Sequence, residues 1–205
     1  MMGETIIPDS ISNPIRTGFH PDPSICRVGE DYYLVTSSFT WFPGLPIYHS
    51  RDLTNWSLIG HALTNPKAID FNGMTDNDGI WAPTLRYHNG TFYLITTAHG
   101  CGGNFYMTAK NPAGPWSDPV WLKDAPGIDP SLFFDEDGRC YYTGNRWDFK
   151  SAWPAQCAVW MQELDLKKRC LGRRTKKHWP MAMRLMQIRK DLIYQNKGPL
   201  SIVDG

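Results

Sequence analysis

Cysteine is scarce and unpaired in this 205-residue sequence, and several common targeting signals are absent. The five cysteines stand singly at positions 26, 101, 140, 157 and 170, without a Cys-x-x-Cys or a histidine-spaced pair. This spacing predicts neither a disulfide framework nor a zinc site. The first residues lack the basic stretch and apolar run of a signal peptide, and no segment has the apolar length of a membrane span. The sequence therefore predicts a cytoplasmic protein with no metal and no membrane partner.

Nucleotide-binding motifs are also absent. Gly100, Gly102 and Gly103 form a glycine-rich stretch, but it lacks the strand-turn-helix context of a phosphate-binding loop. We expect no nucleotide and no other cofactor.

Acidic residues are missing from one part of the chain. The overall net charge is +1, but residues 1–166 hold 10 Lys and Arg against 18 Asp and Glu, a net charge of −8. Residues 167–190 hold 10 Lys and Arg and no acid, a net charge of +10. One folded unit rarely changes character so abruptly. The charge pattern therefore divides the chain into residues 1–166 and a basic tail, residues 167–205.

A short motif recurs three times within the first part. It reads Asp-Pro-Ser-Ile at 22–25, Ala-Pro-Thr-Leu at 82–85 and Asp-Pro-Ser-Leu at 129–132. Each copy leads into a short apolar run, a turn with Gly and a polar residue, and a run of aromatic and β-branched residues, which is the pattern of a β-hairpin. The copies are 60 and 47 residues apart, and recurrence on this scale predicts the blades of an all-β propeller.

The repeat makes Asp22 and Asp129 equivalent positions. Innermost strands of successive blades line the axis of a propeller, so we expect the two carboxylates to meet at one end of it. Pro21 and Pro23 flank Asp22 in a stiff, non-helical segment that fixes where the side chain points. Like charges that approach each other cost free energy, so this pairing favours a functional site over a structural turn.

Four segments in order carry a family resemblance: "NPIRTGFHPDPSI", "SSFTWFPGLPIYHSRDLTNW", "GIWAPTLRYHNGTFYLITTA" and "GIDPSLFFDEDG". From about residue 13 to about residue 166 the sequence resembles glycoside hydrolase family 43, and above all its β-xylosidases and α-L-arabinofuranosidases. The resemblance implies a five-bladed β-propeller, of which this chain would hold about three to four blades and be of doubtful stability. It also implies hydrolysis of small oligosaccharides, either xylo-oligosaccharides or arabinofuranosides, with inversion of configuration. Neither substrate preference nor oligomeric state follows from the sequence.

The resemblance also implies which acids act. Members use an Asp as general base, a Glu as general acid, and a second Asp that raises the pKa of the Glu and orients it. By motif, Asp22 is similar to the base and Asp129 to the pKa modulator. An inverting glycosidase needs two carboxyl groups about 6.5 to 9.5 Å apart, one to activate water and one to protonate the leaving oxygen.

Four further residues are substrate-binding candidates. Trp81 and Phe39 match the aromatic residues that form the walls of the family's glycone pocket, where a flat sugar face stacks on a ring. His20 is expected to act as a hydrogen-bonding partner near the base. Asn104 lies on the glycine-rich stretch, from which it can face the pocket.

The expected general acid is missing from its place. A Glu-x-Pro-His-Leu type of segment would fall at residues 176–189, which read "KKHWPMAMRLMQIR". The only Glu after Glu136 is Glu163, which lies in a strand-like segment at another repeat position. The sequence therefore predicts a truncated glycosidase that is inactive or impaired. The alternative is a non-catalytic carbohydrate-binding fragment.

Three interpretations of the basic tail compete. Its charge alone suits a nucleic-acid surface, but neither interleaved aromatics nor a helix cap supports one. An amphipathic helix around "PMAMRLMQIRKDLIY" has only partial helical periodicity. We favour a reading frame lost near residue 169, which explains the charge change and the lost repeat together, and we expect no nucleic-acid partner.

Overall fold

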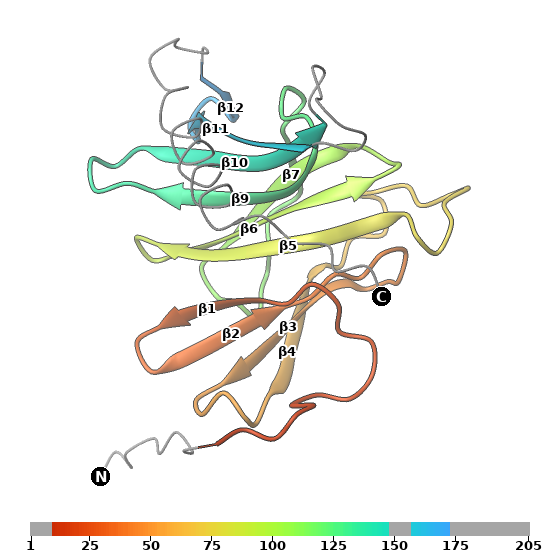
Figure 1. Ribbon diagram of the computed structural model, residues 1–205, viewed down its shortest axis with the longest axis vertical. Coiled ribbons are helices and arrows are strands. Elements are labelled where there is room, and N and C mark those ends of the chain that lie inside the picture. The colour runs from red at the N-terminus through yellow and green to blue at the C-terminus, as the bar shows by residue number, and fades with distance from the viewer. Residues whose placement is uncertain (1–9, 148–156, 173–205) are drawn as a thin grey trace, which may run out of the picture.

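The computed structural model describes residues 10–147 and 157–172, and every regular element in these ranges is a β-strand. The strands form three antiparallel four-stranded sheets, each with its strands in chain order (Figure 1). The first sheet contains β1 (Ser24–Val28), β2 (Asp31–Val35), β3 (Gly44–Ser50) and β4 (Ser57–Leu63). The second contains β5 (Gly79–His88), β6 (Thr91–His99), β7 (Gly103–Ala109) and β8 (Val120–Trp121). The third contains β9 (Ile128–Phe134), β10 (Cys140–Trp147), β11 (Cys157–Asp165) and β12 (Cys170–Leu171).

Each copy of the repeated motif lies at the first strand of a sheet. β1, β5 and β9 lie side by side, with β5 in the middle (Figure 1). The motif serines join the sheets: the Ser24 hydroxyl accepts a hydrogen bond from the Leu85 backbone N–H at 3.1 Å, and the Ser131 hydroxyl accepts one from Arg86 Nη2 at 3.0 Å. This arrangement confirms the all-β prediction of an incomplete propeller, with three sheets as successive blades.

The turn between β5 and β6 explains how one of these hairpins is fixed. Asn89 and Gly90 occupy it with φ of +47° and +71°, the signs that a type I′ turn requires at both central positions. Such a turn matches the twist of the strands and therefore sets their register.

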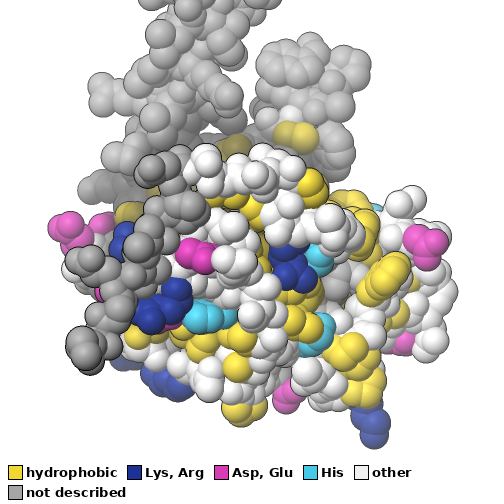
Figure 2. All heavy atoms as spheres, turned by 90° about the horizontal axis from the view of Figure 1, so that it is seen from below, with side chains coloured by type: hydrophobic (Ala, Val, Ile, Leu, Met, Phe, Trp, Pro, Cys, Tyr) yellow, Lys and Arg dark blue, Asp and Glu magenta, His cyan; other side chains and the backbone are white. Residues whose placement is uncertain are grey.

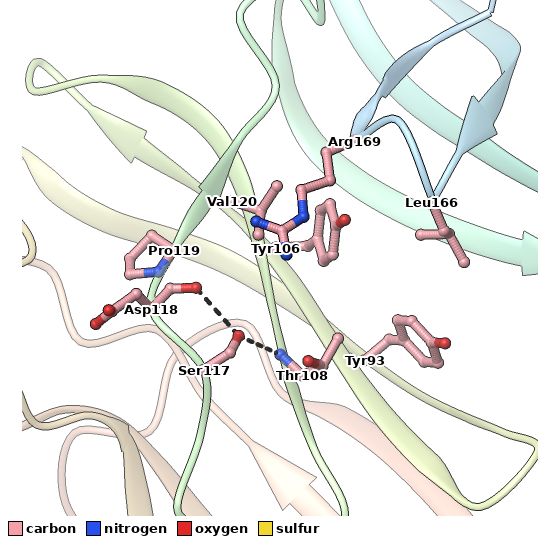
Figure 3. A pocket seen from close by; sticks show the side chains of 9 residues that line it. All are labelled: Tyr93, Tyr106, Thr108, Ser117, Asp118, Pro119, Val120, Leu166 and Arg169. Atoms are coloured by element: carbon pink, nitrogen blue, oxygen red, sulfur yellow. Dashed lines mark hydrogen bonds between the residues drawn. The ribbon is translucent and has the colours of Figure 1, made fainter.

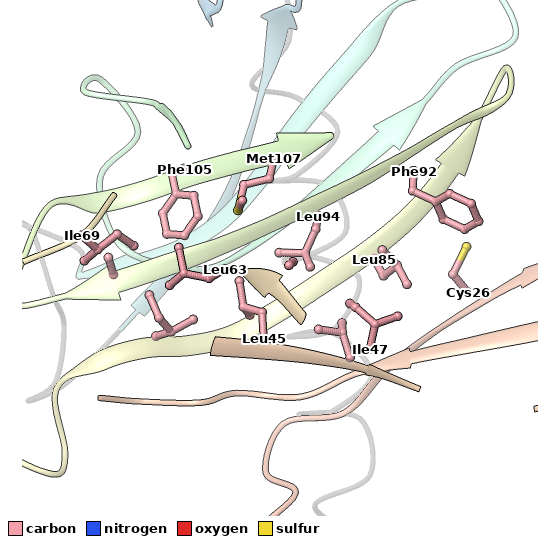
Figure 4. Close-up of a cluster of buried hydrophobic side chains, with 14 residues drawn as sticks. Cys26, Leu45, Ile47, Leu63, Ile69, Leu85, Phe92, Leu94, Phe105 and Met107 are labelled. Atoms are coloured by element: carbon pink, nitrogen blue, oxygen red, sulfur yellow. The ribbon is translucent and has the colours of Figure 1, made fainter. Parts of the chain in front are cut away.

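One hydrophobic core lies between the first and second sheets, and another lies between the second and third. Figure 4 shows the first, in which Leu45, Ile47 and Leu63 of the first sheet face Leu94 and other side chains of the second. Ile95 is the next residue along β6, and it packs into the second core, against the third sheet. Successive residues of a strand point to opposite faces. The second sheet is therefore covered on both faces.

Of the basic tail, only residues 167–172 lie in the described ranges. They complete the hairpin of β11 and β12, in which Leu171 pairs with Leu164, so the charge boundary at residue 166 falls within that hairpin. Residues 176–189, where the general acid was expected, and the possible helix lie outside the described residues. Within the described ranges there is no helix, and so none that could cross a membrane.

Candidate active site

Asp22 and Asp129 share an unusual backbone conformation. Their φ angles are +52° and +55°, in the left-handed region that costs a non-glycine residue roughly 1–2 kcal/mol. Aspartate tolerates this region better than most residues do, because its short side chain bonds locally. Ala82, in the second copy, is not among the residues with positive φ and lies where the pairing of β5 with β6 shifts register. Only the two acid-bearing copies therefore share one geometry.

The Asp22 carboxylate is held by a hydroxyl group. Ser37 Oγ donates a hydrogen bond to Asp22 Oδ2 at 2.6 Å, and the Ser37 backbone N–H bonds to the Pro21 carbonyl at 3.0 Å. The short O–H to carboxylate distance is typical of a charge-assisted bond. Asp22 is thus fixed from outside its own segment, while its side chain stays exposed to solvent.

The pKa of the Asp129 carboxyl group is raised in the folded chain. Although the Asp129 side chain reaches solvent, partial burial of the carboxyl group raises its pKa, and the negative charge of Asp22 raises it further. A hydrogen bond from the Asn145 side chain acts in the opposite direction. The negative charge of Asp22 therefore acts on the carboxyl group of Asp129.

Backbone pairing places the segment of Phe39 beside the start of β5, which holds Trp81. Phe39 and Ile80 exchange two N–H to carbonyl hydrogen bonds, each 2.9 Å long, so the Phe39 segment lies beside the residue next to Trp81. A Cβ at Gly79 would lie 2.4 Å from the Phe39 carbonyl oxygen, so this close approach requires glycine. Both aromatic side chains are half-buried.

Two exposed aromatic residues extend this group, and the sequence analysis missed them. The Phe19 ring lies 5.7 Å from that of Phe39 and stacks on Trp41 at 5.9 Å. Phe19 and Trp41 are 57% and 67% exposed. Their positions within "GFHPDP" and "TWF", beside the candidate residues, could have identified them. Most aromatic residues in such a sequence belong to the core, so position alone did not single them out.

His20 has the contacts of a supporting side chain. Its Nε2 lies 3.2 Å from the Thr17 carbonyl oxygen and its Nδ1 lies 3.4 Å from the Tyr48 hydroxyl. The His20 and Tyr48 rings also meet edge to face. Both contacts hold the imidazole in place, and a role of His20 beside the base stays a prediction.

Asn104 lies beneath the candidate site. It is only 1% exposed, and its Oδ1 accepts a hydrogen bond from Thr97 at 2.6 Å. Its Nδ2 lies 2.8 Å from the Ala125 carbonyl, 3.1 Å from the Gly127 carbonyl and 2.9 Å from the Tyr142 hydroxyl. Asn104 therefore supports the segment that leads into Asp129, and its predicted contact with substrate has no support in this geometry.

Glu163 does not join the two aspartates. It is exposed on β11, opposite Tyr141, which in turn pairs with Phe133 on β9. Two strand spacings and the four residues from Phe133 back to Asp129 separate the Cα atoms of Glu163 and Asp129 by roughly 16 Å. The described residues thus supply two members of the expected trio of acids.

The aspartates do not line the pocket shown in Figure 3. That pocket, of about 440 Å³, lies where β6, β7 and β8 meet the β11–β12 hairpin. Its lining residues are Tyr93, Tyr106, Thr108, Ser117, Asp118, Pro119, Val120, Leu166 and Arg169. None of the sequence-derived candidates is among them.

Among the described residues, the two aspartates belong to no candidate metal site. In the part of the chain that the structure describes, no group of three His, Cys, Asp or Glu side chains is placed to hold a metal ion. Figure 2 views the molecule from the side of the first sheet, where hydrophobic and histidine side chains mix with isolated charges. The colouring of this face shows no continuous area of one charge.

Sequence comparison connects these features with known proteins. The sequence model of the family described as Glycosyl hydrolases family 43 matches residues 11–195, a range that includes most of the basic tail. A xylosidase/arabinosidase of Butyrivibrio fibrisolvens is 47% identical over 201 residues, which cover 95% of this chain and 37% of that protein. The non-reducing end α-L-arabinofuranosidase BoGH43B of Bacteroides ovatus is 55% identical over 146 residues, covering 69% of this chain and 27% of its own length.

Solved structures give a similar result. A xylan β-1,4-xylosidase from Bacillus halodurans C-125 superposes with a TM-score of 0.74 at 46% identity, covering 80% of this chain and 33% of its own. A GH43_12 protein from a capybara gut metagenome gives a TM-score of 0.75 at 46% identity, covering 79% and 31%. The chain spans about a third of the length of the curated relatives it matches.

Proposed function

This chain belongs to glycosyl hydrolase family 43, and we propose that it acts on xylosides or arabinofuranosides through Asp22 and Asp129. The observation that carries the proposal is the shared left-handed backbone of Asp22 and Asp129, which occupy equivalent places in the motif copies of the first and third sheets although they lie 107 positions apart in the sequence. Relatives named as xylosidases and arabinofuranosidases support the substrate class, since both act on five-carbon sugars.

Asp22 is the general base in this proposal. Its carboxylate removes a proton from a water molecule as that water attacks the anomeric carbon from the face opposite the leaving group, which inverts the configuration. The hydrogen bond from Ser37 and the flanking prolines hold the carboxylate in place. Such positioning supplies much of the rate in a reaction of this kind.

Asp129 sets the protonation of the general acid. A carboxylate beside another carboxyl group raises the pKa of that group, so the acid stays protonated near neutral pH. Glu163 is too far away to be that acid, and the sequence of residues 176–189 contains no Glu. We therefore propose that this chain is impaired in protonating the leaving group and cleaves substrates whose leaving group needs no proton.

The test is release of nitrophenol from nitrophenyl β-xyloside and nitrophenyl α-L-arabinofuranoside by the 205-residue chain. Asp22→Ala is expected to lower kcat by about 100-fold or more, the range for loss of a general base. Asp118→Ala is the matched control, because Asp118 is also followed by proline but lies in the pocket of Figure 3. Undiminished release by Asp22→Ala would remove Asp22 from the mechanism.

A second comparison tests the missing acid. General acid catalysis contributes about 10²- to 10⁴-fold, and nitrophenolate leaves without much help. Relative to an intact family member, the chain should therefore favour the nitrophenyl xyloside over xylobiose by about that factor. Equal relative rates on the two substrates would show that another residue supplies the proton, and binding without any release would favour the carbohydrate-binding alternative.

A further inference from the structure

The indole of Trp81 is covered on one face by the imidazole of His99. The two rings are parallel to within 8°, and their centroids are 3.8 Å apart. Trp81 lies near the start of β5 and His99 at the end of β6, where the two strands pair. Trp81 is half-buried and His99 is exposed, so this stack lies at the surface and not in either hydrophobic core.

His99 is itself held by a carboxylate. Its Nδ1 lies 2.9 Å from Asp78 Oδ1. A carboxylate only accepts hydrogen bonds, so Nδ1 carries the proton of this bond. The other oxygen of Asp78 accepts hydrogen bonds from the backbone N–H of Thr75 at 3.0 Å and from its hydroxyl at 2.8 Å. These bonds to Thr75 lower the pKa of Asp78, which keeps it charged.

The same turn also holds the indole nitrogen. Trp81 Nε1 donates a hydrogen bond to the Asn77 carbonyl at 2.8 Å. Gly100, with φ of +78°, allows the end of β6 to approach this turn, since a Cβ there would lie 2.9 Å from Met74 Sδ and 3.3 Å from Asp78 Oδ1. Residues 75–78 thus restrain both the indole and the ring that covers it.

We infer that His99 and Asp78 are positioning residues that fix the Trp81 indole and leave its other face for a pentose ring. The inference rests on the proposed function, in which Trp81 forms a wall of the sugar pocket. A binding ring has to be held within about 0.5 Å and 10–20° of its productive position. A surface indole with one hydrogen bond can still tilt about that bond, and the stacked imidazole, tied to Asp78, prevents the tilt.

Four variants of the full chain test this role. His99→Ala removes the stack, His99→Phe keeps a flat ring but loses the bond to Asp78, and Asp78→Asn keeps the shape but loses the charge. His88→Ala is the matched control. His88 lies at the other end of β5 and also stacks on an aromatic ring, that of Phe134, with ring centroids 4.3 Å apart and planes 6° from parallel. If His99→Ala fails to fold, His99→Phe and Asp78→Asn still carry the test.

The first readout needs no sugar. Hydrogen exchange of the Trp81 indole N–H, followed by NMR, should be faster in His99→Ala by about threefold to tenfold, the size of one lost aromatic stack. It should be intermediate in His99→Phe, which keeps a stacked ring without the bond to Asp78, and in Asp78→Asn, and it should be unchanged in His88→Ala. An unchanged exchange rate in both His99→Ala and Asp78→Asn would overturn the inference, whatever the sugar affinity.

The second readout is the Kd for xylobiose and for methyl α-L-arabinofuranoside. His99→Ala should weaken binding about threefold to tenfold, and His99→Phe, which restores the stack but not the bond to Asp78, should recover part of it. In active preparations KM should rise while kcat changes little, because Trp81 does not touch the reacting atoms. Equal weakening by His88→Ala would overturn the inference. A wild-type chain that binds neither sugar while the indole exchange responds as expected would overturn the proposed function instead.

Discussion

The second and third sheets follow the same four-stranded plan but differ in how many faces are covered. In β6 the residues Leu94 to Ala98 are all buried, because one face of the strand meets the first sheet and the other meets the third. In β11 buried and exposed residues alternate, and Val159 is 61% exposed. The second sheet is therefore the structural centre of the described residues, and the acids lie on the sheets that flank it.

The motif copies also differ between the second sheet and the two sheets that flank it. Asp22 and Asp129 belong to the flanking sheets, whereas the second sheet has Ala82 at the equivalent place. The second sheet contributes support instead: Arg86 bonds to Ser131, and Asn104 bonds to the segment before Asp129. The candidate acids and the side chains that support them therefore lie on neighbouring sheets.

The largest effect is expected where the second sheet is most deeply buried. Leu94→Ala should lower the free energy of unfolding by about 3–5 kcal/mol, because it leaves a cavity between two sheets. Val159→Ala, on the exposed side of the third sheet, should change it by about 0.5 kcal/mol or less. Urea denaturation measures both, and similar losses for the two variants would contradict the difference between the sheets.

A smaller effect is expected at the junction of the second and third sheets. A Cβ at Gly127 would lie 1.9 Å from the Asn145 carbonyl oxygen at a φ of +95°. Gly127→Ala should therefore lower the free energy of unfolding by about 2–3 kcal/mol, because a backbone atom has to move and the left-handed conformation is strained.

Gly138→Ala is the matched control for the junction. It has a φ of +82°, but its Cβ would meet no heavy atom within 4 Å. Only the conformational strain of about 1 kcal/mol should remain there. A Gly138→Ala loss as large as that of Gly127→Ala would show that the close approach before Asp129 is unimportant.

The sequence predicted the sheets better than it predicted the site. Hairpin turns such as Asn89-Gly90 and the repeated motif are local signals, so the blades and the convergence of Asp22 with Asp129 could be inferred from them. The sequence predicted that Asn104 faces the pocket, because it lies on a glycine-rich stretch. Its burial depends on Tyr142 and Ala125, which are distant in the sequence.

Other features of the site had no sequence signal at all. The stack of His99 on Trp81 depends on the register of β5 with β6, and one residue of slippage would place His99 on the other face. The positive φ of both aspartates had no signal in the sequence either. A motif shows which residues recur but not which contacts they make.

The smallest effect concerns the charge on Asp129. Its pKa in the folded chain is raised above the ordinary value of 3.8, mainly by partial burial and also by Asp22. The folded state therefore holds this proton more tightly than the unfolded chain does. The resulting stabilisation is fully present below pH 3.8 and is lost as the pH rises through the raised pKa. Asp129→Asn, which keeps the shape and tolerates the positive φ, should remove this loss.

Relative to wild type, Asp129→Asn should therefore gain stability between acid and neutral pH, by less than about 1 kcal/mol because solvent screens the exposed side chain. Denaturation midpoints at several pH values from 3.5 to 7 measure this gain. In an Asp22→Asn background the neighbouring charge is gone, so the gain should shrink, and a double-mutant cycle gives the coupling. A gain that is the same at every pH would show that the pKa of Asp129 is not raised in the folded chain. A gain that Asp22→Asn does not change would show that the two carboxylates do not interact. The difference between the acid-bearing sheets and the sheet with Ala82 would then have no electrostatic basis.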